Sequence, residues 1–474
     1  MDSNTVLNIF REITTIPRES GHEERMTAYL QDFAAARGLA CKTDGTGNVV
    51  ITREAAPGKE GVPTLVLQCH QDMVCEKNAG CAHDFAKDPI PYVIEDGWMV
   101  APETTLGADD GIGIAACLAL LDSDLPTGKL ECLFTISEET GMDGAMALEP
   151  GFFTGKTLIN LDSEDEGQLF VGCAGGVNTM ATFRYETEPV RPGSVRLRLR
   201  VFGAQGGHSG DDINKERCNT VQQMARFLFG EHGNFQLLRF EGGNKHNAIA
   251  RETEAAVAVP AETAGAFQER FTRFGRELAA EFAVSDPGVQ VSVTPLECSC
   301  PAVEGETADR LISALVSVHH GVLAMSQDIP GLVETSNNLA SVRMTEGTFD
   351  VCTSQRSSVE SAKKFIADKV EACFRLAGAQ VRRSDPYPGW KPDMQSNILK
   401  VCCESYRRLF GTDPEVKAIH AGLECGLFLE KFPGLDMISF GPTLRGVHAP
   451  GEKLDLASNE KFVRHLIDVV TCFE

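Results

Sequence analysis

The chain has 474 residues, of which 42% are hydrophobic, so it is too long for one core and about right for two or three domains. It carries 44 basic and 67 acidic residues, a net charge of −23, which argues against nucleic acid and anionic membrane surfaces as partners. No hydrophobic run approaches the ~20 residues of a membrane span. The N-terminus lacks the features of a signal peptide, so we expect a cytoplasmic location.

Helices and strands alternate in the first part of the chain. Residues 5–37 are predicted to be helical with an interruption at Pro17, and a helix of small residues is predicted at 111–121. Buried strands are predicted at three places, residues 64–68, 131–136 and 157–161. This alternation is typical of an α/β fold, with a sheet that carries helices on both faces.

The pattern changes after the Pro-rich segment 188–193. Apolar residues alternate with arginine over 195–201, which predicts a strand of an antiparallel sheet with one solvated face. Further helices are predicted near 215–229, 264–282, 307–318 and 358–377, and further strands near 289–293, 349–353 and 379–383. The sequence therefore predicts an inserted α+β domain of residues 189–388.

The first pattern resumes after a second Pro-rich segment, 385–392. Helices are predicted at 396–410 and 458–472, and strands at 416–420 and 435–440. We expect residues 1–188 and 389–474 to form one α/β domain with a shared sheet. In that arrangement His448, which lies between the last strand and the last helix, can join side chains from the N-terminal part.

Imidazole and carboxylate side chains follow the predicted strands of that domain: His70 and Asp72, then Glu138 and Glu139, then Asp162. Because ligands of open α/β sheets gather at the carboxyl ends of the strands, we expect these side chains to converge on one edge. Asp109 and Asp110 lie in a glycine-rich loop that enters a helix, where one carboxylate can bridge two ions.

Mixed imidazole and carboxylate ligands suit zinc, and also cobalt or manganese. Two such ions ~4 Å apart can polarise a carbonyl and lower the pKa of a bridging water towards ~7. Glu138 and Glu139 are neighbours, so one can bind metal while the other transfers a proton. Asp72 can fix the tautomer of the His70 ring. Each motif alone is typical of a surface loop or an acidic turn, but the ordered set predicts a dinuclear metal site.

Six segments carry a resemblance to a known family: LQCHQDMV at 67–74, LGADDGIG at 106–113, EETGMDGA at 138–145, NLDSE at 160–164, GGHSG at 206–210 and HAGLECG at 420–426. They resemble the zinc-dependent aminopeptidase, aminoacylase and carboxypeptidase superfamily of co-catalytic metallohydrolases. Within it the chain is most similar to the aminoacyl-histidine dipeptidases. The segments spread over nearly the whole length, and as an ordered set they are highly specific.

The resemblance implies a mixed-sheet metallopeptidase catalytic domain that binds two divalent ions, with zinc expected first and cobalt or manganese as substitutes. It implies five metal ligands, namely His70, Asp109 as the bridge, Glu139, Asp162 and His448. Glu138 would be the general base and acid, and Asp72 would orient His70. Gln71 and Asp110 stand where relatives often carry other residues, yet neither removes a ligand.

The resemblance also makes the inserted domain a lid through which a homodimer forms. His208 of this lid would steady the oxyanion of the tetrahedral intermediate when the lid closes. Asn247 and Arg356 are candidates for holding the C-terminal carboxylate of the substrate, since the arginine fork pairs with a carboxylate. His420 and Glu424 are candidates for the pocket wall or for supporting the metal ligands from behind.

The function expected on these grounds is a metal-dependent dipeptidase that cleaves short peptides of the Xaa-His type, β-alanyl-histidine included. An N-acyl amino acid deacylase or a tripeptidase on the same scaffold is the alternative, because the metal ligands do not separate these substrates. A non-catalytic binding protein would be favoured by loss of a ligand or of Glu138, and none is lost.

The 16 cysteines are scattered, and many lie inside apolar runs. No CxxC pair exists, and the spacings of Cys298 with Cys300 and of Cys402 with Cys403 are too short for a zinc ribbon. A disulfide framework is typical of short secreted chains, so we expect buried, reduced thiols. Cys69 and Cys173, which lie near the expected site, are interpreted as buried bystanders.

Overall fold

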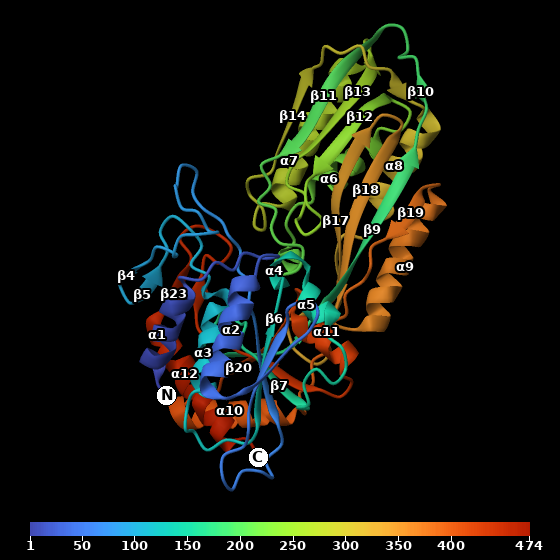
Figure 1. Cartoon of the computed structure of the whole chain (residues 1–474). Coiled ribbons are helices and arrows are strands. Elements are labelled where there is room, and N and C mark those ends of the chain that lie inside the picture. The colour runs from blue at the N-terminus through green and yellow to red at the C-terminus, as the bar shows by residue number, and fades with distance from the viewer. The chain divides into compact units, whose positions relative to one another are not determined.

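A computed structural model describes all 474 residues (Figure 1). The chain divides into two compact units. Unit 1 comprises Met1–Cys173, Trp390–Ala418 and Leu423–Glu474, and unit 2 comprises Ala174–Gly389 and Ile419–Gly422. The domain boundaries after residues 188 and 388, which rest on composition, stay a prediction.

Unit 1 is built on an eight-stranded sheet of order β1-β2-β6-β3-β7-β21-β8-β20. Its strands are β1 (Ala40–Thr43), β2 (Val49–Arg53), β3 (Leu65–His70), β6 (Leu130–Thr135), β7 (Thr157–Asn160), β8 (Gln168–Cys173), β20 (Glu415–Ile419) and β21 (Asp436–Ser439). The four central strands β6, β3, β7 and β21 run parallel, whereas β2 and β8 pair antiparallel with their neighbours. The sheet is therefore mixed, and its strands come from both ends of the chain.

The longer helices of unit 1 are α1 (Ser3–Ile13), α2 (Glu24–Arg37), α3 (Ala108–Leu121), α10 (Asn397–Phe410), α11 (Glu424–Lys431) and α12 (Leu456–Cys472). Helix α3 packs against β3 and β6, and α10 packs against β21. The predicted mixed α/β fold is confirmed. The single interrupted helix expected at 5–37 is two helices, because the segment that follows Pro17 forms a turn before α2 begins.

Helix α3 lies in the core of unit 1. From Gly111 to Leu121 every residue is buried, and this stretch of glycine, alanine, isoleucine, cysteine and leucine is apolar on every side. A helix of this kind belongs in the middle of a core. Leu118 is completely buried, so its replacement by alanine is expected to cost about 2–5 kcal/mol.

A small second sheet of unit 1 has the order β22-β23-β5-β4. It consists of β4 (Val93–Glu95), β5 (Trp98–Val100), β22 (Leu444–Arg445) and β23 (Lys453–Asp455). The loop between β22 and β23 carries His448. Since β23 pairs with β5, the small sheet fixes this C-terminal loop against the N-terminal part of unit 1.

Unit 2 contains a nine-stranded sheet of order β14-β11-β13-β12-β17-β18-β9-β19, with β16 paired to β17. Its strands are β9 (Gly175–Arg184), β11 (Ser194–Phe202), β12 (Gln236–Gly243), β13 (Thr253–Pro260), β14 (Gln290–Pro295), β16 (Gly321–Met325), β17 (Val333–Thr345), β18 (Thr348–Ser357) and β19 (Gln380–Arg383). All of its pairings are antiparallel. A two-stranded ladder, β10 (Thr187–Glu188) with β15 (Ala302–Val303), completes the strands.

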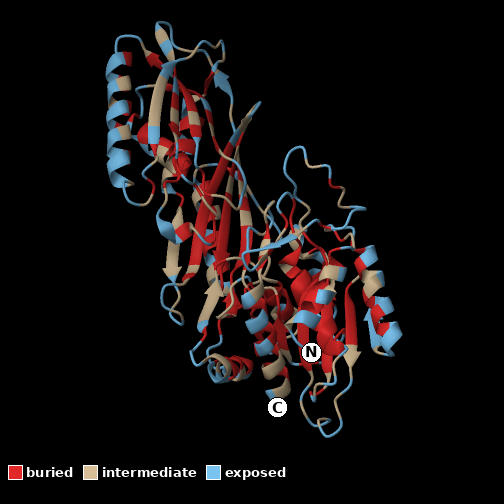
Figure 2. Ribbon diagram, turned by 90° about the vertical axis from the view of Figure 1, so that its left-hand side faces the viewer, coloured by how far each residue is buried: buried red, intermediate tan, exposed pale blue.

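Four helices pack on this sheet, α6 (Thr220–Gly230), α7 (Ala264–Glu281), α8 (Gly305–Ser317) and α9 (Glu360–Leu376). Figure 2 shows buried residues concentrated where the strands and helices of the unit meet. In β11 the buried residues Leu197, Leu199 and Val201 alternate with exposed or half-buried arginines, as the sequence predicts. The α+β composition expected for the inserted domain is therefore confirmed.

The two halves of the nine-stranded sheet meet at one narrow seam. Strands β12 and β17 share two residue pairs, Gly242 with Val342 and Gly243 with Ser341, whereas β17 and β18 share ten. Gly243 has a φ of +67°, and a Cβ there would lie 1.9 Å from the carbonyl oxygen of Ala340. The close approach of the strands at the seam therefore requires glycine at 243.

None of the helices combines the length and the apolar character that crossing a bilayer requires. The cysteine prediction is wrong at one pair, because Cys298 and Cys300 form a disulfide. The loop after β14 brings their Cα atoms to 5.6 Å, within the range that a disulfide spans. The other cysteines form no disulfide, and Cys69 and Cys173 are buried as expected, whereas Cys41 and Cys472 are exposed.

Candidate metal centre

The predicted metal ligands all lie in unit 1, at the carboxyl ends of the central strands or in loops beside them. His70 is the last residue of β3, and Asp162 lies two residues beyond β7. Glu139 is in α4 (Glu138–Gly141), a short helix that begins three residues after β6. Asp109 lies at the start of α3, where its φ and ψ are not helical, and its peptide bond to the next residue is cis.

The two imidazoles approach opposite oxygens of Asp109. His70 Nε2 lies 3.0 Å from Asp109 Oδ1 and 3.4 Å from Asp162 Oδ1. His448 Nε2 lies 3.1 Å from Asp109 Oδ2 and 2.9 Å from Glu139 Oε2. The structure therefore brings all five predicted ligands together, with Asp109 between the two histidines.

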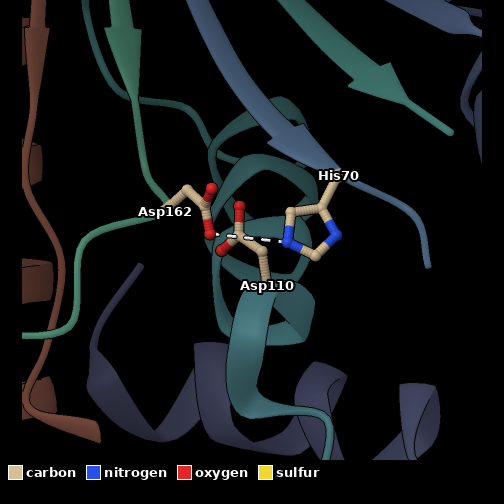
Figure 3. A group of neighbouring side chains, drawn as sticks. All are labelled: His70, Asp110 and Asp162. Atoms are coloured by element: carbon tan, nitrogen blue, oxygen red, sulfur yellow. Dashed lines mark ion pairs between the residues drawn. The ribbon is translucent and has the colours of Figure 1, made fainter. Parts of the chain in front are cut away.

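Two groups of side chains in this cluster could hold a metal ion. The ligand atoms of His70, Asp110 and Asp162 lie within 4.8 Å of one another, and so do those of His70, Asp109 and Glu139. Figure 3 shows the first group, with a dashed line for the ion pair between Asp162 and His70 and the carboxylate of Asp110 beside that of Asp162. Asp110 is not among the five predicted ligands, but it belongs to one of these groups.

The donor set fits a divalent cation. Asp110 Oδ1 accepts a hydrogen bond from the N–H of Gly113 at 3.2 Å, whereas its Oδ2 is buried and has no hydrogen-bond partner. Glu139 Oε1 is likewise buried without a partner. Buried carboxylate oxygens without donors are costly unless a positive charge lies beside them. Imidazole and carboxylate atoms at this spacing are ligands that zinc and related ions accept.

The electrostatics of the cluster also favour a cation. Burial raises the pKa of Asp162 well above its usual range, and Asp109 adds to this shift. Burial likewise raises the pKa of Asp110. Although burial acts in the same direction on Asp109, hydrogen bonds from His448 and His70 hold the pKa of Asp109 well below its usual range. Hydrogen bonds to Asp109 and Glu139 raise the pKa of His448 to about 11. The cluster therefore concentrates negative charge that positive charge must balance.

Asp72 contacts both His70 and the turn that carries Glu138 and Glu139. Its Oδ1 lies 3.3 Å from His70 Nδ1 and accepts the N–H of Glu138 at 3.1 Å. Its Oδ2 accepts the hydroxyl of Ser20 at 2.7 Å and the N–H of Glu139 at 3.2 Å. Although burial opposes the shift, the hydrogen bonds from His70 and Ser20 lower the pKa of Asp72 to about 2. One carboxylate therefore fixes the His70 ring and the backbone of the Glu138–Glu139 turn.

Glu138 stands beside the centre, at the first position of α4. Burial raises the pKa of Glu138 well above its usual range, and the charges of Glu424 and Glu139 add to the shift. Glu424, the first residue of α11, is itself buried, and its Oε2 accepts hydrogen bonds from Gln68 Nε2 at 2.6 Å and from Thr135 Oγ1 at 2.8 Å. Burial raises the pKa of Glu424 to about 7. The carboxylate of Glu424 is therefore held by side chains of two central strands, β3 and β6.

The other predicted site residues lie in unit 2. Arg356, near the end of β18, donates from Nε to Ser209 Oγ at 3.3 Å and from Nη1 to the hydroxyl of Tyr387 at 3.0 Å. His420 Nε2 lies 2.7 Å from Ser336 Oγ. Burial lowers the pKa of His420 to about 3, and the positive charge of Arg356 adds to this.

His208 belongs to the same group of unit 2. Its Nδ1 lies 3.3 Å from Asp211 Oδ2, and a Cβ at Gly210 would lie 2.1 Å from the carbonyl oxygen of His420 and 3.2 Å from His208 Cε1. A pocket of about 590 Å³ is lined by both His208 and Asn247. The N–H of Ser209 donates to the carbonyl of Asn247 at 2.9 Å. His208, Asn247, Arg356 and His420 therefore gather within unit 2.

Two buried charged residues of unit 1 were not identified from the sequence. Glu452 accepts hydrogen bonds from the backbone of the loop that precedes Asp109, and Arg18 donates to backbone carbonyls of the same region. A glutamate after Pro-Gly and an arginine after proline are typical of surface turns. Their partners are backbone groups far away in the chain, so the single sequence holds no signal for them.

Known proteins are similar to this chain over nearly its whole length. The model of peptidase family M20/M25/M40 matches residues 66–471. The cytosol non-specific dipeptidase of Escherichia coli (strain K12) is 37% identical over 454 residues, which are 95% of this chain and 94% of that protein.

Solved structures are similar as well. The crystal structure of aminoacylhistidine dipeptidase from Vibrio alginolyticus superposes with a TM-score of 0.93 and 38% identity, and the match covers 99% of this chain and 96% of that one. Aminopeptidase PepT from Bacillus cereus has a TM-score of 0.58 at 16% identity, with 99% of this chain and 98% of that chain covered, which shows a shared fold alone.

Proposed function

The chain belongs to peptidase family M20/M25/M40, and from this premise we propose that it is a metal-dependent dipeptidase. Two relatives that match over nearly the whole chain support the proposal, since both are dipeptidases by name. One name is non-specific and the other specifies aminoacyl-histidine. We therefore propose short peptides of the Xaa-His type as substrates, β-alanyl-histidine included.

The observation that carries the proposal is the position of Asp109 between two imidazoles, at 3.0 Å from His70 and 3.1 Å from His448. We infer two divalent ions per chain, zinc first, with cobalt or manganese as substitutes. His70 and Asp162 would hold one ion, Glu139 and His448 the other, and Asp109 both. When bound, such ions polarise a carbonyl and make water a stronger acid.

Glu138 is the proposed general base. Its carboxylate takes a proton from the attacking water and delivers it to the nitrogen of the departing amine. Burial raises the pKa of Glu138, and a raised pKa suits a group that must hold a proton before it delivers that proton to the departing amine. Asp72 keeps the His70 ring in one orientation, and His208 is the proposed donor to the developing oxyanion.

Four residues are proposed to bind the substrate. Arg356 pairs with the C-terminal carboxylate of the dipeptide, and its support is a guanidinium already oriented by Ser209 and Tyr387. Asn247 contributes its side-chain amide to the same carboxylate. His420 and Glu424 shape the pocket, and the low pKa of His420, which burial causes, keeps its ring neutral.

The assembly and the location are proposed on weaker grounds. A homodimer through the domain of residues 189–388 rests on the family resemblance alone. A cytoplasmic location is supported by the word cytosol in the name of the Escherichia coli relative. The net charge of −23 is consistent with a protein that binds neither nucleic acid nor anionic membranes.

The test is hydrolysis of a panel that contains β-alanyl-histidine, glycyl-histidine, other dipeptides, a tripeptide and N-acyl amino acids. The protein is stripped with a chelator and restored with zinc, cobalt or manganese. Metal-restored cleavage of the histidine dipeptides supports the proposal. Cleavage confined to tripeptides or to N-acyl amino acids would keep the chemistry and discard the dipeptidase assignment. Absence of metal-dependent cleavage of every compound would contradict the proposed function.

A further inference from the structure

The carboxylate of Glu452 is buried against the backbone of the loop before Asp109, with 2% of the residue exposed. One oxygen accepts the N–H of Leu106 at 2.6 Å and that of Gly107 at 3.0 Å. The other accepts the N–H of Ala108 at 2.8 Å and that of Asp109 at 3.4 Å. A single side chain thus receives four consecutive backbone donors, the last of which belongs to the proposed bridging ligand.

Arg18 holds the carbonyl side of the same loop. It is also 2% exposed, and its guanidinium donates to the carbonyls of Gln71 at 2.9 Å, of Asp72 at 2.5 Å and of Gly107. Arg18 therefore joins the loop that follows His70 to the loop that precedes Asp109. The N–H of Gly107 is bound to Glu452 and its carbonyl to Arg18, so this peptide unit is fixed from two sides.

The conformation of the loop leaves room for the guanidinium of Arg18. Gly107 has a φ of +69°, and a Cβ there would lie 2.7 Å from Arg18 Nη2. A side chain at position 107 would therefore displace the guanidinium, and the positive φ itself favours glycine.

Glu452 also ties the two segments that supply neighbouring ligands. It lies four residues after His448, and its backbone N–H donates to the carbonyl of Ala449 at 3.2 Å. Its backbone carbonyl accepts the N–H of Ala101 at 3.0 Å. Movement of the Glu452 side chain would therefore change the position of Asp109 relative to His448, which are the two residues proposed to share an ion.

We propose that Glu452 is a positioning residue for the metal centre, which sets the position of Asp109 relative to His448 through four backbone hydrogen bonds. The proposal rests on the proposed function, because it assumes that Asp109 and His448 bind metal. Residues that orient ligands from outside usually change metal affinity or activity by about 10- to 100-fold when they are replaced.

The first variant is Glu452→Gln, which keeps the shape of the side chain. A carboxamide has one acceptor oxygen, and its NH₂ group would face two backbone donors instead of accepting from them. We expect the stripped variant to bind zinc and cobalt about 10- to 100-fold more weakly than the wild-type chain in calorimetric titration. Metal affinity is read here without any substrate.

The matched control is Glu131→Gln in the same unit. Glu131 is also buried, at 3% exposure, and it accepts the N–H groups of Thr154 at 2.7 Å and Gly155 at 3.0 Å. It lies in the first half of β6, whereas the metal centre is at the strand's other end. Both variants should lower the melting temperature of the metal-free protein, but Glu131→Gln should bind zinc as the wild-type chain does.

A second variant, Arg18→Lys, keeps the positive charge but loses the fork that reaches three carbonyls, and it should also weaken zinc binding. If Glu452→Gln and Arg18→Lys bind zinc within twofold of the wild-type chain, the inference is wrong. Equal weakening in Glu131→Gln would also overturn it, because the effect would then be general destabilisation. Failure of the wild-type chain itself to bind zinc, cobalt or manganese would instead contradict the proposed function.

Discussion

The two groups of functional side chains differ in charge and in what they leave unsatisfied. The group in unit 1 is rich in carboxylates, and three of its buried oxygens, on Asp110, Glu139 and Glu424, have no donor. The group in unit 2 consists of arginine, histidine and asparagine, and the pKa of its His420 is lowered to about 3 by burial and by Arg356. The buried atom without a partner in this second group is a ring nitrogen, His420 Nδ1. Negative charge therefore dominates the first group, whereas the second carries the positive charge of Arg356.

This difference suggests a division of work within a peptidase. The unit 1 group is suited to activate water and to accept protons, which requires negative charge close to a bound cation. The unit 2 group is suited to recognise the carboxylate end of a peptide and the oxyanion, which requires neutral or positive donors. Replacements in the two groups should therefore have different kinetic signatures.

The largest effect is expected from Asp109→Asn, which would break the unit 1 group. The amide removes the negative charge that both histidines face, at 3.0 Å from His70 and 3.1 Å from His448. We expect dipeptide hydrolysis to fall below detection, and the zinc content measured by mass spectrometry to drop. Asp122→Asn, an exposed residue of the same unit, should change neither measurement. Full zinc content with full activity in Asp109→Asn would show that Asp109 is not the bridging ligand.

Glu138→Gln separates metal binding from proton transfer within unit 1. The variant keeps all five proposed ligands but lacks the base, so kcat should fall by about 10²- to 10⁴-fold at normal zinc content. Steady-state kinetics with glycyl-histidine measures the loss. Glu149→Gln, on the surface of the same unit, is the control. Turnover near the wild-type value would show that another group carries the proton.

Arg356→Lys tests the unit 2 group. We expect this variant to bind the substrate more weakly while the catalytic step is unchanged. Loss of the fork removes a charge-assisted hydrogen bond of about 1.5–3 kcal/mol. This corresponds to a roughly 10- to 100-fold rise in KM, with zinc content unchanged. Arg270→Lys is matched, since Arg270 is another arginine of unit 2, paired with Glu231 at 2.6 Å outside the group. A fall in kcat with unchanged KM would argue against carboxylate recognition.

The smallest effect concerns the stability of unit 2 in acid. Burial lowers the pKa of His420 to about 3, from an ordinary value of 6.5. Below about pH 6.5 the unfolded chain binds a proton at this position and the folded chain does not, so the free energy of unfolding falls as the pH falls. From about pH 7 to about pH 5.5 the loss from this histidine is about 1.4 kcal/mol.

Chemical denaturation of the wild-type chain and of His420→Asn at both pH values measures this loss in the free energy of unfolding, because the variant lacks the histidine. An identical pH dependence in wild type and His420→Asn would mean that the folded chain protonates His420 without penalty.

The location of the proposed metal centre could be predicted from local sequence because each proposed ligand is attached to a recognisable element. His70 ends a strand of buried apolar residues, Asp162 follows another, and Asp109 precedes a helix of small residues. Such boundaries are readable from hydrophobicity and glycine alone. His448 required the further assumption that both ends of the chain share a sheet, and β21 beside β7 fulfils it.

Some features could not be predicted from the sequence, because they depend on backbone groups and on strand order. Glu452 is separated from Leu106 by 346 residues, and its partners are N–H groups that every residue possesses. The position of β21 between β7 and β8 is a matter of topology, for which periodicity holds no information. The Cys298–Cys300 disulfide was missed because rules on redox compartment outweigh local spacing in a sequence argument.

The seam between β12 and β17 has a consequence for how unit 2 responds to stress. Each half of its sheet has long ladders of its own, but only two residue pairs connect the ladders, one of them through Gly243. Helices α6 and α8 contact strands of both halves, so the two halves share one hydrophobic core. The seam is therefore the part of the sheet with the fewest backbone hydrogen bonds, and local opening commonly begins in such places. We expect amide hydrogens to exchange faster at the seam than inside either half, while the shared core keeps the unfolding of unit 2 in one stage.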